Sequence, residues 1–354
     1  MPNTKAYAAY NSTEPLAPFE FDRREVRPND VKVEILYCGV CHSDLHQVRD
    51  EWNGSIYPMV PGHEIVGRVT EVGSEVKGFK AGDLAGVGVL VDSCRVCKNC
   101  NKSMENYCVE GMTGTYNTTE RDGVTVAQGG YSTQIVVDER YVLHVSDKLD
   151  IKAVGPLLCA GITTYSPLRF AGVTKGMKVG VVGLGGLGHM GVKFAVSFGA
   201  EVTVLSTSPS KEADAKKLGA HKFLITKDEE QMKAHEAYFD VILNTISANH
   251  NYEPYLNLLD MDGKLLIVGL PSINPEVNPF ALIKNRRSII GSMIGGMKET
   301  QEMLDYCAEH NIVAEVEVIS IDKVNEAYDR MLKGDVHYRF VIDIATLKNS
   351  TTNS

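Results

Sequence analysis

The 354-residue sequence has a single tryptophan, no low-complexity segment and no apolar run suited to secretion or membrane insertion. Its first residues, Met1 to Lys5, lead into no signal-peptide core. Its most apolar stretch, residues 179–196, contains several glycines together with His189 and Lys193, so it would span a membrane poorly. These absences predict a cytoplasmic protein.

An excess of positive charge is also missing. The chain has 36 Lys and Arg residues against 45 Asp and Glu residues, a formal net charge of −9. A partner with a phosphate backbone or an anionic membrane surface is therefore not expected. The length suggests about two domains, and a hydrophobic content of 44% is ordinary for a soluble globular protein.

The even number of cysteines does not indicate a disulfide framework. A chain of this length can bury a sizeable core without staples, and no secretion signal is expected. Several cysteines instead have the C-x-x-C spacing of metal ligands. We therefore predict reduced thiols at Cys38, Cys41, Cys94, Cys97, Cys100, Cys108, Cys159 and Cys307.

The pattern of apolar residues changes twice along the chain. The first 150 residues are β-rich, with period-two alternation at 31–37 and 66–72. From about residue 155 short apolar strands alternate with helices, which is typical of a parallel doubly wound sheet. After residue 296 the pattern changes again. We predict a catalytic domain of residues 1–154 and 296–354 that is interrupted by a dinucleotide-binding domain of residues 155–295.

The segment from Cys41 to Glu64 is the richest in chemistry-bearing side chains. Zinc binds thiolate sulfur and imidazole nitrogen, and a catalytic zinc keeps one position open for water or substrate. A purely structural site would need no surplus of acid–base groups, whereas this segment has one. The relevant side chains are Cys41, His42, Ser43, Asp44, His46, His63 and Glu64.

Four further cysteines follow the spacing Cys94-x-x-Cys97-x-x-Cys100-x7-Cys108. Four thiolates at such short spacing close a tetrahedral zinc site with no open position. The spacing differs from both ferredoxin patterns of iron–sulfur proteins. Nearby charges are mixed, which disfavours a nucleic-acid zinc finger. We expect a structural zinc, with buried or disulfide-linked cysteines as the alternative.

A glycine-rich turn follows the strand expected at 178–182. Gly183-x-Gly185-x-x-Gly188 precedes a helical pattern, which is the context that a dinucleotide fingerprint requires. In such a turn the backbone, here including Gly186 and Leu187, approaches the pyrophosphate at a helix N-terminus. The alternative is a glycine-rich surface for helix packing.

The end of the next strand bears on the cofactor. An NAD site usually has an acidic residue there for the ribose 2′-hydroxyl. This chain instead has Ser206, Thr207 and Ser208, followed by Lys211, and no acid before Glu212. Hydroxyls and a lysine suit a 2′-phosphate, so we predict NADP(H). An ordinary turn before a helix is the alternative.

Together these motifs resemble the zinc-dependent medium-chain alcohol dehydrogenases, in the cinnamyl-alcohol-dehydrogenase-like branch that includes bacterial NADPH-dependent aldehyde reductases. The resemblance runs from about residue 5 to residue 345. It also includes Leu158-Cys159-Ala160-Gly161 and residues 291–300. It implies an α/β protein with a GroES-like β-rich catalytic domain and a Rossmann nucleotide-binding domain.

The resemblance also implies roles for particular residues. Cys41, His63 and Cys159 are expected to hold the catalytic zinc. Glu64 is expected to be an alternate ligand, or else an ordinary solvated or hydrogen-bonded glutamate. Asp44 would orient His63. Ser43 and His46 would relay a proton through a cofactor ribose hydroxyl, and His42 would contact the cofactor pyrophosphate or remain a surface histidine.

The expected activity is the zinc-dependent interconversion of aldehydes and primary alcohols by hydride transfer with NADP(H), with two zinc ions per chain. A quinone or enone reductase of the same superfamily is one alternative, but such enzymes often lack the zinc ligands. A non-catalytic zinc- and nucleotide-binding redox sensor is another. Members of this branch are often dimeric, and the strand expected at 288–294 suits pairing across a twofold axis.

Overall fold

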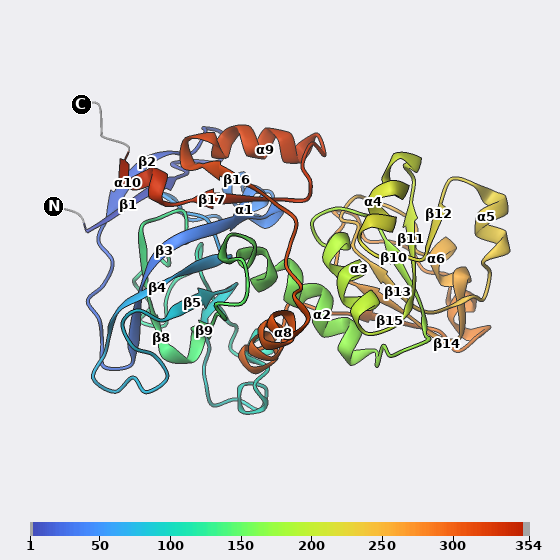
Figure 1. Ribbon diagram of the computed structural model, residues 1–354, viewed down its shortest axis with the longest axis horizontal. Helices are drawn as coiled ribbons and strands as arrows, with labels where there is room; N and C mark the ends of the chain where they lie inside the picture. Colours follow the sequence, from blue (N-terminus) through green and yellow to red (C-terminus); the bar gives the residue numbers. More distant parts are fainter. Residues whose placement is uncertain (1–2, 350–354) are drawn as a thin grey trace. The chain divides into compact units, whose positions relative to one another are not determined.

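The computed structural model describes residues 3–349 of the chain. The chain folds into two compact units (Figure 1). The first unit comprises Met1–Cys159 and Gly295–Ser354, and the second comprises Ala160–Ile294. Among the described residues, none of the helices combines the length and apolar character needed to cross a membrane.

The first unit is built on a seven-stranded sheet in the order β16-β17-β3-β4-β5-β9, with β8 paired to β3. Its long strand β3 buries alternate side chains, as the period-two pattern predicts. All pairings are antiparallel except that of β16 with β17. The strands are β3 (Asp30–Val40), β4 (Ile65–Val72), β5 (Leu84–Val87), β8 (Gln134–Asp138), β9 (Leu143–His144), β16 (Val316–Ser320) and β17 (Arg339–Asp343).

Among its described residues, this unit also contains two small antiparallel sheets and four α-helices, besides short 3-10 turns. The small sheets are β1 (Thr4–Ala8) with β2 (Ala17–Phe21), and β6 (Leu90–Asp92) with β7 (Thr113–Gly114). The helices are α1 (His42–Val48), α8 (Met297–His310), α9 (Val324–Leu332) and α10 (Ala345–Asn349).

The second unit has a six-stranded parallel sheet in the order β12-β11-β10-β13-β14-β15. This is the strand order 3-2-1-4-5-6 of dinucleotide-binding folds, whose ligands bind at the carboxyl ends of the strands where the order reverses. The strands are β10 (Lys178–Val182), β11 (Glu201–Ser206), β12 (Lys222–Ile225), β13 (Phe239–Asn244), β14 (Leu259–Ile267) and β15 (Ser288–Gly291).

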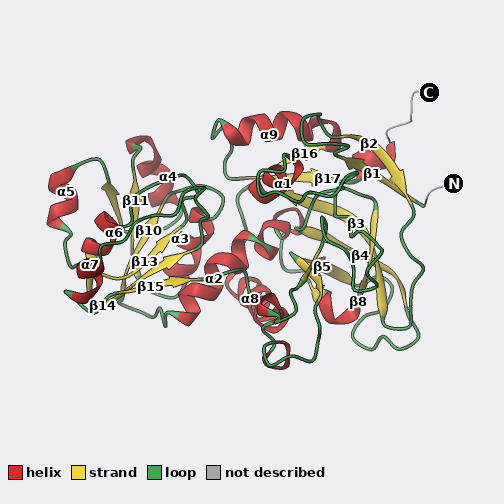
Figure 2. Ribbon diagram, turned by 180° about the vertical axis from the view of Figure 1, so that it is seen from behind, coloured by secondary structure: helices red, strands yellow, loops and turns green. Residues whose placement is uncertain are grey.

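Helices lie on both sides of this parallel sheet. Figure 2 shows α2 and α3 on one side and α6 and α7 on the other. The predicted α/β class and doubly wound sheet are therefore confirmed. The helices are α2 (Ala160–Phe170), α3 (Gly188–Ser197), α4 (Glu212–Lys217), α5 (Glu229–Ala234), α6 (Glu253–Leu258) and α7 (Pro279–Ile283).

Candidate active site

Helix α1 begins where strand β3 ends, and Cys41 stands between them. The backbone N–H of Cys41 donates a hydrogen bond of 2.9 Å to Asp44 Oδ2. This bond folds the chain back at the first turn of the helix, where a carboxylate is electrostatically favoured. The Cys41 side chain is thereby held at the end of a buried strand.

Asp44 also holds His63 in place. Its carboxylate is fully buried, lies 3.1 Å from His63 Nδ1 and accepts hydrogen bonds of 3.1 Å from Gly62 N and Tyr131 Oη. A carboxylate only accepts, so Nδ1 carries the proton and Nε2 is left free to bind a metal. Burial disfavours the charged imidazole, but the adjacent Asp44 outweighs it and raises the pKa of His63.

Cys41, His63, Glu64 and Cys159 converge, with one ligating atom from each lying within 4.8 Å of the others. The Sγ atoms of Cys41 and Cys159 are 3.9 Å apart, and neither cysteine is in a disulfide. Tetrahedral zinc with Zn–S bonds of about 2.3 Å separates two sulfurs by about 3.8 Å. The donor set and its spacing therefore fit zinc.

The two thiols behave as a pair. A hydrogen bond from Cys159 lowers the pKa of Cys41 well below its usual range. The same interaction, added to burial, raises the pKa of Cys159. A first proton leaves easily and a second does not unless a cation replaces it. Two buried thiolates therefore need a metal to coexist.

Glu64 is completely buried, which excludes the solvated alternative. Its Oε1 is ion-paired with Arg339 Nη2 from β17, and its Oε2 is buried without a hydrogen-bond partner. Burial raises the pKa of Glu64, although the Arg339 guanidinium opposes the shift. A half-satisfied carboxylate beside two thiols is a further sign of a cation site.

Ser43 and His46 lie one turn apart on α1, and no hydrogen bond joins their side chains in the described part of the chain. His46 Nδ1 lies 2.5 Å from Glu51 Oε2, a short contact, and its ring lies 5.1 Å from that of Trp52. The His46 side chain is 30% exposed. The His46 imidazole is thus in contact both with solvent and with the Glu51 carboxylate. The neighbouring His42 is exposed.

The second cysteine cluster gathers Cys94, Cys97, Cys100 and Cys108, again with their sulfurs within 4.8 Å of one another. Its sulfurs accept hydrogen bonds from backbone N–H groups, including those of Cys94, Cys97, Cys100 and Val109. The N–H groups of Val109 and Cys100 lower the pKa of Cys97 to about 6. Four sulfurs leave no position for substrate, so this cluster fits a closed zinc site.

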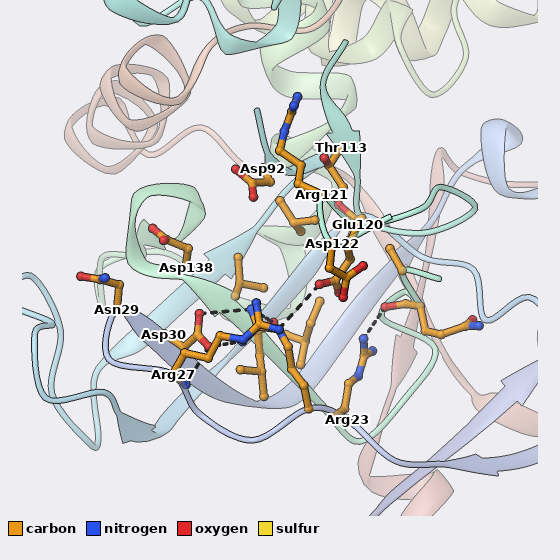
Figure 3. Close-up of a pocket in the computed structure, with 18 of the residues that line it drawn as sticks. Arg23, Arg27, Asn29, Asp30, Asp92, Thr113, Glu120, Arg121, Asp122 and Asp138 are labelled. Atoms are coloured by element: carbon orange, nitrogen blue, oxygen red, sulfur yellow. Dashed lines mark hydrogen bonds and ion pairs between the residues drawn. The ribbon is translucent and has the colours of Figure 1, made fainter. Parts of the chain in front are cut away.

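A polar cavity of about 380 Å³ lies beside the four-cysteine loop (Figure 3). Its lining contains five arginines and five carboxylates, and Arg24 is ion-paired with both Asp30 and Glu120. Arg95, which stands within the loop, bridges Asp92 at 2.9 Å and Asp138 at 2.8 Å. The ion pair between Arg95 and Asp138 therefore connects the loop to the end of strand β8. The charged residues that line the cavity are Arg23, Arg24, Arg27, Arg95, Arg121, Asp30, Asp92, Glu120, Asp122 and Asp138.

The glycine turn after β10 has the geometry of a dinucleotide loop. Gly183 has a φ of +89°, and a Cβ on Gly188 would lie 2.1 Å from the Gly183 carbonyl oxygen. A Cβ on Gly185 would meet nothing within 4 Å. Packing thus explains the first and third glycines, whereas the open space at Gly185 fits a ligand that approaches the backbone.

The other predicted cofactor residues lie at the end of β11. Ser206 is the last residue of that strand, and its Oγ accepts the Ser208 N–H at 3.2 Å. Lys211 Nζ donates to the carbonyl oxygen of Leu184 at 2.8 Å. The lysine therefore joins the hydroxyl-rich turn at 206–208 to the glycine turn, which places a cation where a 2′-phosphate is expected.

Sequence reasoning missed three residues that contact the predicted ones. Tyr131 binds Asp44 from 87 positions away, and Arg339 binds Glu64 from 275 positions away. Glu51 is local to His46, but acidic residues at such spacing are common. Arg339 alone left a signal, as a charge at the start of strand β17 followed by three apolar residues.

Two protein-family models match the chain. Residues 27–147 match the alcohol dehydrogenase GroES-like domain, and residues 186–309 match the zinc-binding dehydrogenase model. The chain is 56% identical over 347 residues to the aldehyde reductase YahK of Escherichia coli K12, covering 97% of this chain and 99% of that protein.

Solved structures are similar as well. A cinnamyl alcohol dehydrogenase of Sorghum bicolor matches with a TM-score of 0.95 at 44% identity, covering 99% of this chain and 100% of that one. The CAD of Helicobacter pylori complexed with NADP(H) matches with a TM-score of 0.91 at 44% identity, covering 98% and 99%. The chain therefore belongs to the zinc-dependent medium-chain alcohol dehydrogenase family, in its cinnamyl-alcohol-dehydrogenase-like branch.

Proposed function

We propose that this chain is an NADP(H)-dependent oxidoreductase that interconverts aldehydes and primary alcohols at a zinc ion. The observation that carries the proposal is the convergence of Cys41, His63 and Cys159 beside a helix with a hydroxyl and an imidazole one turn apart. The names of its relatives, an aldehyde reductase and a cinnamyl alcohol dehydrogenase, point to the same reaction. A broad range of aldehydes is the expected substrate class.

Cys41, His63 and Cys159 would hold the catalytic zinc. Three protein ligands leave one position open, and two thiolates balance the charge of the ion. Glu64 is the possible alternate ligand, since one of its oxygens is engaged by Arg339 and the other is buried without a partner. Asp44 positions His63 through Nδ1 and touches no substrate.

When bound, zinc supplies a Lewis acid for the carbonyl oxygen and NADPH supplies the hydride. The protein then has to provide one proton to the new alcohol oxygen. We assign this step to the Ser43 hydroxyl. His46, which lies beside Glu51, would then take up a proton from solvent and restore the proton of Ser43. The contact of 2.5 Å between His46 Nδ1 and Glu51 Oε2 fixes the imidazole tautomer, which leaves Nε2 to exchange the proton.

Cys94, Cys97, Cys100 and Cys108 would hold a second, structural zinc. The loop that carries them is tied to its surroundings mainly by polar contacts, such as those of Arg95. Such a loop has little apolar surface to bury and needs a metal to hold it together.

NADP(H) would bind at the carboxyl edge of the parallel sheet. Its pyrophosphate would meet the backbone of Gly183, Gly185, Gly186, Leu187 and Gly188. The 2′-phosphate would meet Ser206, Thr207, Ser208 and Lys211, since that turn offers hydroxyls and a cation and no carboxylate. Exposed His42 remains a candidate for contact with the cofactor.

The proposed domains are a GroES-like catalytic domain of residues 1–154 and 296–354 and a Rossmann domain of residues 155–295. Support comes from the compact units of the fold. We also propose a cytoplasmic location, because thiolate-bound zinc needs a compartment that keeps cysteines reduced, and all eight cysteines are outside disulfides.

We further propose a homodimer formed through strand β15. It is an edge strand of the parallel sheet, and the segments near it expose large apolar side chains, namely Met261, Leu270, Ile273, Phe280 and Ile283. An uncovered edge beside apolar surface is a usual site of symmetric association.

The deciding experiment measures kcat/KM for NADPH and NADH with a panel of aldehydes and one enone. We expect aldehyde-dependent oxidation of NADPH, favoured over NADH by about 10- to 100-fold, the worth of one charge-assisted contact to a phosphate. Reduction of the enone alone would instead support a quinone or enone reductase, and a preference for NADH would overturn the cofactor assignment.

A further inference from the structure

The loop of residues 245–251 follows β13 and leads into α6. Strand β10 lies between β11 and β13 in the sheet. The loop after β13 therefore lies beside the glycine turn, on the side opposite to the 206–211 turn. In a dinucleotide fold the two mononucleotide halves occupy these two sides, so this loop faces the half without the 2′-phosphate.

This loop is in direct contact with the glycine turn. The N–H and hydroxyl of Thr245 both donate to the carbonyl oxygen of Val182, at 3.1 and 2.7 Å. A Cβ on Gly183 would lie 3.1 Å from Thr245 Oγ1 and 3.2 Å from a side-chain carbon of Ile246. A shift of the loop would therefore alter the space over the turn.

A hydrogen bond between the Asn244 and His250 side chains joins the two ends of the loop. Asn244, the last residue of β13, is 1% exposed. Its Oδ1 accepts the Ile246 N–H at 3.2 Å, so its amide nitrogen is the atom that faces His250 Nε2, at 2.8 Å. His250 Nδ1 lies 2.7 Å from the Ala248 carbonyl oxygen.

These contacts fix the state of the imidazole. The amide nitrogen of Asn244 only donates, so Nε2 accepts and Nδ1 carries the proton. The ring is flanked by Tyr252 and Tyr255, at 5.1 and 5.8 Å between centroids. Without this acceptor, a buried amide N–H would lose its partner, which is unfavourable enough to displace the loop.

We propose that His250 is a positioning residue for the dinucleotide: through Asn244 it holds residues 245–251 as the wall beside the glycine turn. It would act on the cofactor through the loop. The inference rests on the proposed binding of NADP(H), and it assigns to this chain a determinant of cofactor affinity outside the glycine turn and the 206–211 turn.

Two substitutions separate the two hydrogen bonds of the ring. In His250→Gln the side-chain oxygen lies near the place of Nε2 and still accepts from Asn244. In His250→Asn the amide lies near Nδ1 and keeps only the Ala248 contact. We expect the dissociation constant for NADPH, from its fluorescence on titration, to rise about five- to tenfold in His250→Asn and His250→Ala. His250→Gln should bind NADPH within about twofold of the wild type.

His235→Ala on the same unit is the control, since its Nδ1 lies 2.8 Å from the local Gln231 carbonyl oxygen and its ring packs on Tyr238 and Phe239. Equal affinity in all three His250 variants, at the wild-type value, would overturn the inference. Equal weakening in all three, with a matching loss of thermal stability, would overturn it too, because it would show a packing role. Failure of the wild type to bind NADPH would instead refute the proposed function.

Discussion

Functional side chains in this molecule are each held in position by a second residue. Asp44 shows this most clearly, because one buried carboxylate fixes the backbone of Cys41, the tautomer of His63 and the hydroxyl of Tyr131. Glu51 has the same relation to His46. The chemistry of the site therefore depends on residues that bind neither metal nor substrate.

The proton path provides a test at this scale. We expect His46→Ala to lower kcat by about 100-fold, the usual contribution of a positioned acid–base group, while zinc content stays unchanged. Glu51→Gln should lower kcat less, because the amide still contacts Nδ1. Zinc analysis and steady-state kinetics check both variants. Loss of one zinc in His46→Ala would mean that His46 is a ligand.

Spacing alone predicted part of the site. Cys41 and His63 lie 22 positions apart and the four-cysteine motif is compact, so local sequence indicated both clusters. Cys159 lies far from both, and only the family resemblance singled it out. Tyr131 and Arg339 were not predicted, since their contacts span 87 and 275 positions and form only in the folded chain.

At the scale of elements, one unexpected contact connects the four-cysteine loop with helix α8. The N-cap of this helix is Gly296, which has no side chain to accept the first N–H groups. Glu105 from the loop supplies the acceptor, with Oε2 3.0 Å from Met297 N. A Cβ on Gly296 would lie 1.9 Å from the Ser103 carbonyl oxygen, so the loop also requires glycine there.

Removal of this cap should destabilise the chain. We expect Glu105→Ala to lower the melting temperature by about 2–4 °C, the effect of losing a cap worth about 1 kcal/mol. Glu105→Gln keeps an acceptor oxygen and serves as the matched control. A thermal melt that is identical for wild type and Glu105→Ala would show that the contact contributes nothing.

The strands predicted at 31–37, 66–72 and 178–182 are observed within three residues of those bounds, because apolar periodicity is strong in buried strands. The differences have local causes. Strand β14 begins at Leu259, ahead of its apolar run at 265–267, and Asp262 between them has a φ of +65° that interrupts the alternation. Strand β15 ends at Gly291, before the expected 294, and Ile294 itself has a φ of +41°.

At the scale of the whole molecule, the proposed dimer is testable by mass. We expect light scattering during gel filtration to give about twice the chain mass of 38.8 kDa. Phe280→Asp combined with Ile283→Asp should shift the protein toward the monomer, because both side chains are exposed on α7. Val124→Asp, on an 83% exposed residue of the other unit, is the control. A wild-type mass of 38.8 kDa would contradict the dimer.

The central claim is that Cys41, His63 and Cys159 hold a catalytic zinc that is separate from the zinc of the four-cysteine loop. Zinc per chain in Cys159→Ala, measured together with aldehyde-dependent NADPH oxidation, tests it most directly. The account predicts a fall from two zinc ions to one, loss of turnover and unchanged affinity for NADPH. Retention of two zinc ions, or of turnover, would contradict it.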